Sequence, residues 1–195
     1  MKSDINFLYE IGAFRMVQRA WKRFMNQHAQ NITEHTFRVV WISLLLAQQE
    51  KKVNTEKMMK MALVHDISES RTGDVDYLSR QYTTRDEVKA VEDIFKDSSL
   101  EKEFIELYEE YEKKDSIESK IVKDADNLDV EIELHELEVQ GSNLREVWQA
   151  SRDKSVYPTL YTEAAKKMWK EIRDSHPHDW HLHTRNRFLA GDWKD

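Results

Sequence analysis

The sequence contains no cysteine, and its 195 residues include only four glycines and two prolines. Without cysteine the chain can form neither a disulfide framework nor a thiolate metal site. The scarcity of glycine and proline leaves little of the turn chemistry that a sandwich or barrel of short strands requires. A glycine-rich phosphate loop and a serine-centred nucleophile motif are also missing. The scarcity of glycine and proline therefore favours a helical fold, and the missing motifs argue against those two kinds of chemistry.

The chain also lacks an apolar run that could cross a membrane, which takes roughly 18 residues. Its longest such run, from Val39 to Ala47, is interrupted by Ser43. The first six residues contain no apolar signal core. We therefore expect no membrane partner and a cytoplasmic location.

Net charge and chain length further limit the class of protein and its possible ligands. The net charge is −7, whereas surfaces that bind polymeric nucleic acid are rich in lysine and arginine. A small phosphorylated molecule needs only a local positive site and stays possible. With 39% apolar and 34% charged residues, the chain fits one soluble, helix-rich domain spanning residues 1–195.

Apolar residues recur at helical spacing through most of the chain. Asn31, with a glutamate three residues later, resembles a capping box and predicts a helix that carries His35 in its first turn. Asn54 is expected to cap the next helix, which carries His65 and ends before Gly73.

Further helices are predicted to begin at Thr83 or Thr84, at Ser98 or Ser99, at Asp115 or Ser116, and at Pro158. The third of these reaches about Gln140 and is followed by a loop at residues 141–143. No repeat, linker or convincing strand pattern is present. The sequence therefore predicts an all-α single domain that ends in a tail from residue 176.

His65 and Asp66 are adjacent, with His35 upstream and Asp126 downstream. Imidazole nitrogens and carboxylate oxygens are ligands that divalent cations accept. Two neighbouring ligands cannot surround an ion, but two more from other helices could do so and still leave positions for water and substrate. That arrangement is typical of hydrolytic rather than structural metal sites.

Each of these residues also has a simpler interpretation. A single histidine near a helix start, such as His35, is usually a surface or capping residue. Asp126 lies in a segment that faces inward, where an unpaired carboxylate is costly and requires a cation or a basic partner. A buried ion pair with Lys123 or Arg38 is therefore the alternative to a metal.

Two further acids lie close to the histidine–aspartate pair in the sequence. On a continuous helix Glu69 would project beside His65 and Asp66, and Asp74 follows Gly73 in a turn. Both could simply be solvated acids at a helix end. Hydrolysis, however, needs one group to take a proton from water and another to protonate the leaving oxygen.

Four segments in order resemble the HD-domain metal-dependent phosphohydrolases, and most closely their 5′-deoxynucleotidase branch: residues 31–35, 62–69, 72–74 and 121–126. The similarity extends from about residue 14 to about residue 144. It implies an HD-type helical bundle with one divalent cation (Mn, Co, Fe, Ni, Zn or Mg) bound by His35, His65, Asp66 and Asp126. It also implies that Glu69 and Asp74 are the catalytic acids.

In that branch an arginine and a tryptophan ahead of the first metal histidine hold the phosphate and sugar of the nucleotide. Arg19 and Trp21 occupy this region, although a solvated face for Arg19 and core packing for Trp21 are the simpler interpretations. The resemblance thus implies a homodimer that hydrolyses (deoxy)nucleoside 5′-monophosphates. Hydrolysis of a triphosphate, cyclic nucleotide or alarmone, and a non-catalytic nucleotide sensor, are the alternatives.

Histidines near the carboxyl end form a second concentration of possible metal ligands: His176, His178, His181 and His183. His-x-His pairs close to a terminus are more often surface residues, and the family resemblance gives this group no support. We expect it to be exposed and without a metal.

Overall fold

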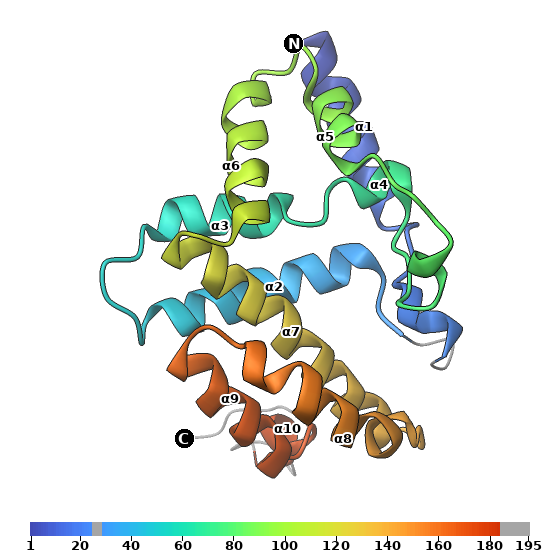
Figure 1. The fold of residues 1–195 in the computed structure, drawn as a ribbon, viewed down its shortest axis with the longest axis vertical. Helices are drawn as coiled ribbons and strands as arrows, with labels where there is room; N and C mark the ends of the chain where they lie inside the picture. The colour runs from blue at the N-terminus through green and yellow to red at the C-terminus, as the bar shows by residue number, and fades with distance from the viewer. Residues whose placement is uncertain (25–28, 184–195) are drawn as a thin grey trace, which may run out of the picture.

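The computed structural model describes residues 1–24 and 29–183, so the last part of the expected tail, residues 184–195, lies outside the described residues. Within the described part the chain forms α-helices and short 3₁₀ turns, and the one extended pairing is an isolated bridge between Gln18 and Asn31 (Figure 1). The predicted all-α class is confirmed. No described helix is long and apolar enough to cross a membrane.

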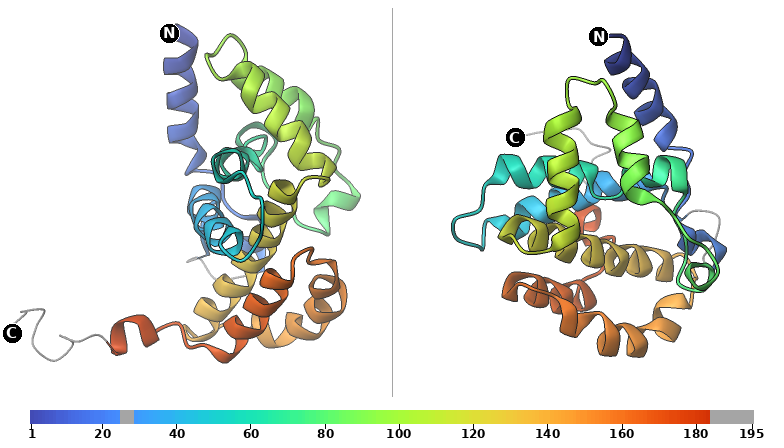
Figure 2. Two further views of the ribbon diagram at one scale, coloured as in Figure 1. Left: turned by 90° about the vertical axis from the view of Figure 1, so that its left-hand side faces the viewer. Right: turned by 45° about the horizontal axis from the view of Figure 1, so that its top comes forward.

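The long helix α7 (Ile117–Glu138) lies at the centre of the bundle. It packs on α2 (Ile32–Ala47), α3 (Thr55–Val64) and α6 (Glu101–Lys113) toward one side and on α9 (Glu163–Asp174) toward the other. Both views in Figure 2 show α7 between the α2–α3 pair and the later helices. The side chains that fill this core are fully buried and include Val39, Leu46, Met58, Met61, Ile121, Leu128 and Trp169.

Local capping fixes where the central helices begin. The Asn31 side chain accepts hydrogen bonds from the first turn of α2, and Glu34 Oε2 accepts one from Asn31 N at 2.8 Å. Asn54 and Ser116 cap α3 and α7 in a similar way. These starts agree with the sequence predictions and place His35 in the first turn of α2.

The helix predicted to run as far as Gly73 is broken. Helix α3 ends at Val64, a turn occupies residues 65–68, and the short helix α4 (Glu69–Thr72) follows. Glu69 therefore does not share a continuous helix with His65, contrary to the sequence interpretation. The break lets the histidine–aspartate pair lie in a turn at the end of α3.

Two later helices also begin after the predicted positions. Helix α5 (Glu87–Phe95) is capped by Asp86, whose side chain accepts a hydrogen bond from the first turn, and not by a threonine. Helix α6 begins after Leu100 and not at a serine. The amino-terminal helix α1 (Lys2–Phe14) packs against α4.

The sequence interpretation missed α8 (Leu144–Ser155), a mostly polar helix with no buried residue. Pro158 does not open the last long helix, because it lies in a 3₁₀ turn (Tyr157–Thr159). Helix α9 instead begins after Thr162, whose side chain accepts a hydrogen bond from its first turn. A short helix, α10 (Asp179–Leu182), follows it.

Candidate active site

The four predicted metal ligands come together from three parts of the chain. His35 comes from α2, His65 and Asp66 from the turn after α3, and Asp126 from α7. One ligand atom from each lies within 4.8 Å of all the others. His35 Nε2 is 3.4 Å from His65 Nε2 and 3.3 Å from Asp126 Oδ1. The cluster is compact enough to share a single cation.

Hydrogen bonds on the far side of each imidazole orient these two histidines. His65 Nδ1 lies 2.7 Å from Ala62 O, and because a carbonyl only accepts, Nδ1 must donate. His35 Nδ1 lies 2.6 Å from Asp129 Oδ2. A neutral imidazole that donates from Nδ1 presents a lone pair at Nε2. Two such lone pairs facing each other beside two carboxylates fit a divalent cation.

The ion-pair alternative for Asp126 is partly correct. Lys123 Nζ lies 2.7 Å from Asp126 Oδ2, but the other oxygen, Oδ1, faces His35. Arg38 pairs instead with Asp129, which is fully buried. Asp129 was missed by sequence reasoning, although it follows Asp126 by one helical turn and so lies on the same face of α7.

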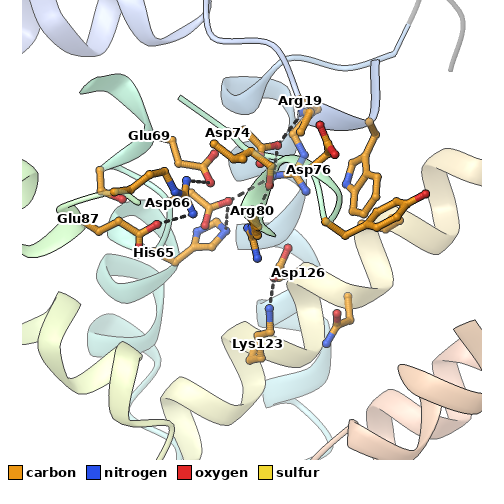
Figure 3. A pocket seen from close by; sticks show the side chains of 18 of the residues that line it. Arg19, His65, Asp66, Glu69, Asp74, Asp76, Arg80, Glu87, Lys123 and Asp126 are labelled. Carbon is orange, nitrogen blue, oxygen red and sulfur yellow. Dashed lines mark hydrogen bonds and ion pairs between the residues drawn. The ribbon is translucent and has the colours of Figure 1, made fainter. Parts of the chain in front are cut away.

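Glu69 is buried and the side chain of Asp74 is only 7% exposed, so neither is a solvated acid at a helix end. Glu69 is 6% exposed, and burial together with the carboxylates of Asp66 and Asp74 raises its pKa to about 9. Glu69 Oε2 has no hydrogen-bond partner. Asp74 Oδ2 accepts a hydrogen bond from Ala20 N at 2.8 Å. Figure 3 shows Glu69 and Asp74 beside the metal-ligand cluster.

Arg19 is also buried, so the solvated-face interpretation is wrong. Its Nη1 lies 3.4 Å from Asp66 Oδ2 and 3.5 Å from Asp74 Oδ2. The guanidinium thus lies between the metal-ligand cluster and one of the two acids. Its Nε is buried and has no hydrogen-bond partner within the protein.

Trp21 belongs to an aromatic group at one side of the site. Its ring centroid lies 6.2 Å from that of Tyr77 and 5.1 Å from that of Trp148 in an edge-on arrangement. Trp21 and Tyr77 both line the pocket, so Trp21 is not simply a core residue. Trp148 was missed because it lies on α8, a helix that the sequence interpretation did not include.

Three of the four proposed ligands (His65, Asp66 and Asp126) line one pocket with a volume of about 460 Å³, together with Glu69, Asp74, Arg19, Trp21 and Tyr77. Despite the acidic chain, its lining includes a set of basic side chains: Arg19, Arg80, Arg85, Lys114, Lys123 and Arg152. Pockets of this size accommodate small ligands, and mixed charges with a few aromatic rings suit a phosphorylated one. Basic side chains that can contact a phosphate are therefore present, interspersed with acids such as Asp76 and Glu87.

The carboxyl-terminal histidines do not join this site. His178 Nδ1 lies 3.0 Å from His181 Nε2 on the exposed segment that contains α10. Among the described residues, the one group of three or more potential metal ligands close enough to share an ion is that around His35.

An all-α bundle with this His₂Asp₂ cluster and an adjacent acid pair defines the class of protein, a helical metal-dependent hydrolase. The chain belongs to the HD domain family, whose sequence pattern matches residues 11–169. It is similar to the 5′-deoxynucleotidase HDDC2 of Danio rerio, with 33% identity over 169 residues that cover 82% of this chain and 84% of the relative. The 5′-deoxynucleotidase HDDC2 of Homo sapiens is 27% identical over 168 residues, which cover 82% of this chain and 81% of the relative.

A solved structure shares the arrangement of helices. A conserved hypothetical protein from Pyrococcus furiosus superposes with a TM-score of 0.74 and 30% sequence identity, covering 88% of this chain and 99% of that chain. The HD-type bundle expected from the sequence resemblance is confirmed.

Proposed function

We propose that the protein is a metal-dependent phosphomonoesterase that converts a deoxynucleoside 5′-monophosphate into a nucleoside and phosphate. One observation carries the proposal: three members of the four-ligand cluster, the acids Glu69 and Asp74, and a buried arginine line a single pocket with an aromatic side. The similarity to proteins named 5′-deoxynucleotidase supports the same substrate class.

The proposed ligands of the cation are His35, His65, Asp66 and Asp126. Two imidazoles and two carboxylates suit Mn, Fe, Co, Ni or Zn, with Mg less well matched to imidazole. When bound, a divalent cation supplies positive charge that stabilises the phosphate and makes a water more acidic. Asp129 and the carbonyl of Ala62 keep the two imidazoles turned toward the cluster.

The other side chains of the site have separate roles in phosphate binding, proton transfer and sugar binding. Ion pairs with Asp66 and Asp74 hold the Arg19 guanidinium at the edge of the cluster. From there its positive charge neutralises negative charge on the phosphate. Glu69 and Asp74 share the two proton transfers, one accepting a proton from the attacking water and the other protonating the leaving 5′-oxygen. Trp21 packs beside the sugar.

The experiment that tests this function is a panel of nucleoside mono-, di- and triphosphates, cyclic nucleotides and alarmones. The protein is first stripped with a chelator and then supplied with one metal at a time. We expect the wild-type protein to release inorganic phosphate from deoxynucleoside monophosphates. The Asp66→Ala variant should release none. Release of pyrophosphate or triphosphate would favour another HD reaction, and tight binding of a deoxynucleotide without turnover would favour a sensor.

We also propose a cytoplasmic homodimer. Three apolar side chains on α2 at one-turn spacing support the dimer, because Phe37, Trp41 and Leu45 are 66%, 56% and 58% exposed. Light scattering after size exclusion tests the mass in solution. Fractionation of cells that produce the protein tests its location.

A further inference from the structure

Arg85 lies between the 3₁₀ turn Ser79–Gln81 and α5, and its side chain reaches the pocket beside Glu69. Its Nη1 donates a hydrogen bond to Gly73 O at 2.9 Å and lies 3.6 Å from Glu69 Oε1. Its Nη2 pairs with Glu87 Oε1 at 2.5 Å. One guanidinium nitrogen therefore contacts both Glu69 and the residue immediately before Asp74.

The turn at Gly73 explains why this contact matters for Asp74. Gly73 has φ 72° and ψ 155°, a conformation that residues with a Cβ rarely adopt. Its carbonyl belongs to the peptide group that leads directly into Asp74, so the bond from Arg85 fixes that peptide plane. The Asp74 carboxylate is held separately by Ala20 N. Asp74 is thus restrained at its backbone and at its side chain.

The buried carboxyl group of Glu69 requires a basic partner such as Arg85. Its carboxyl group is buried near the carboxylates of Asp66 and Asp74, which repel its charged form. Among the described residues, Arg85 is the one basic side chain recorded within 4.0 Å of a Glu69 oxygen. Oε1 faces Arg85, whereas Oε2 has no hydrogen-bond partner. The contact therefore holds one oxygen, and the other has no partner within the protein.

We propose that Arg85 is a positioning residue that fixes Glu69 and the Gly73–Asp74 turn relative to each other. Glu87 holds the second nitrogen and so sets the plane of the guanidinium. Arg85 acts through the two acids and not by contact with the reacting phosphate. This inference rests on the proposed phosphatase function, in which both acids serve the same substrate.

The test compares Arg85→Ala and Arg85→Lys with a matched control, Arg71→Ala. Arg71 lies on α4 and pairs with Glu10 through two hydrogen bonds of 2.8 and 2.9 Å. We expect Arg85→Ala to lower kcat about 100-fold while KM and metal affinity stay within about threefold of wild type, because small misplacement of reacting groups is costly. Lysine should restore part of kcat, since an ammonium can hold one of the two partners. Arg71→Ala should keep the wild-type kcat.

Equal kcat values for Arg85→Ala and Arg71→Ala would overturn the inference, and so would a rise in KM alone. A crystal structure of the Arg85→Ala protein gives a readout that does not need activity. We expect the Glu69 carboxylate to rotate and the Gly73 peptide to shift, and an unchanged Glu69 would also overturn the role. If the wild-type protein hydrolyses no nucleotide, the proposed function fails. The crystal structure of the Arg85→Ala variant then still decides whether Arg85 positions Glu69. Should the alanine variant not fold, Arg85→Gln carries the same comparison.

Discussion

His35 Nδ1 lies 2.6 Å from Asp129 Oδ2, and both side chains are completely buried. The contact keeps His35 Nε2 turned toward the proposed metal. Asp129 also receives hydrogen bonds from Gln30 and Arg38, so it is held on two further sides. Because Asp126 lies one turn earlier on α7, a single helix face supplies both a proposed ligand and the group that orients another.

The first prediction concerns this orienting contact. Asp129→Asn should weaken metal binding about 10- to 100-fold, because an amide cannot match the charge and acceptor geometry of the carboxylate. Chelator competition measures the affinity. Asp124→Asn is the control, since Asp124 lies on the same helix, is fully buried and accepts hydrogen bonds from the backbone before α9. It should lower Tm and leave metal affinity unchanged; equal metal loss in both variants would contradict the assignment.

The second prediction concerns removal of the metal. A cation that binds only the folded state stabilises it, by about 2.7 kcal/mol at a concentration 100 times Kd. Chelation should therefore lower the Tm of wild type by several degrees. The Tm of Asp126→Ala should not respond to chelation, because one of the four ligands is gone. A response of equal size in the variant would mean that the metal binds elsewhere.

The third prediction separates Glu69 from the ligands. Glu69→Gln should retain wild-type metal affinity and lose about 10²- to 10⁴-fold in kcat, as expected for a proton-transfer group. The substitution preserves size and removes only the ability to ionise. Metal analysis of the purified variant and phosphate release are the two measurements. Loss of the metal would show that Glu69 is a ligand.

Glu69 also predicts how pH affects the metal-free protein. Its folded pKa of about 9 exceeds the ordinary value of 4.5, so the folded state binds the proton more tightly than the unfolded chain. This contribution to stability is complete below the ordinary pKa and is lost as pH rises toward 9, by at most about 1.4 kcal/mol per pH unit. Thermal unfolding in chelator should therefore show wild type losing stability relative to Glu69→Gln between pH 5.5 and 8.5. Parallel curves would show that Glu69 ionises normally.

The sequence predicts those parts of the structure that depend on short stretches of chain. The caps at Asn31, Asn54 and Ser116 each involve a few neighbouring residues, so the starts of the central helices could be predicted. The end of α3 at Val64 could not be predicted, because no glycine or proline marks it in the sequence. Helix α8 was missed because it is mostly polar and its few apolar residues, Leu144, Val147 and Trp148, span little more than one turn.

The same distinction holds at the site. The proposed ligands could be selected because their residue types and order match a known family pattern. Arg85 could not be selected from the sequence, because its contacts with Gly73 and Glu69 depend on how a separate loop packs against α4. Trp148 likewise reaches Trp21 only in the folded chain.

The last prediction tests whether Arg19 and Trp21 serve different parts of the nucleotide. Arg19→Lys keeps the buried positive charge beside Asp66 and Asp74 but loses the planar fork that suits phosphate. It should weaken inhibition by inorganic phosphate about tenfold and leave inhibition by the product deoxynucleoside unchanged. Trp21→Ala should do the opposite, because it removes an aromatic surface and no charge. If both variants weaken the two inhibitors equally, the phosphate and nucleoside are not bound by separate sides of the pocket.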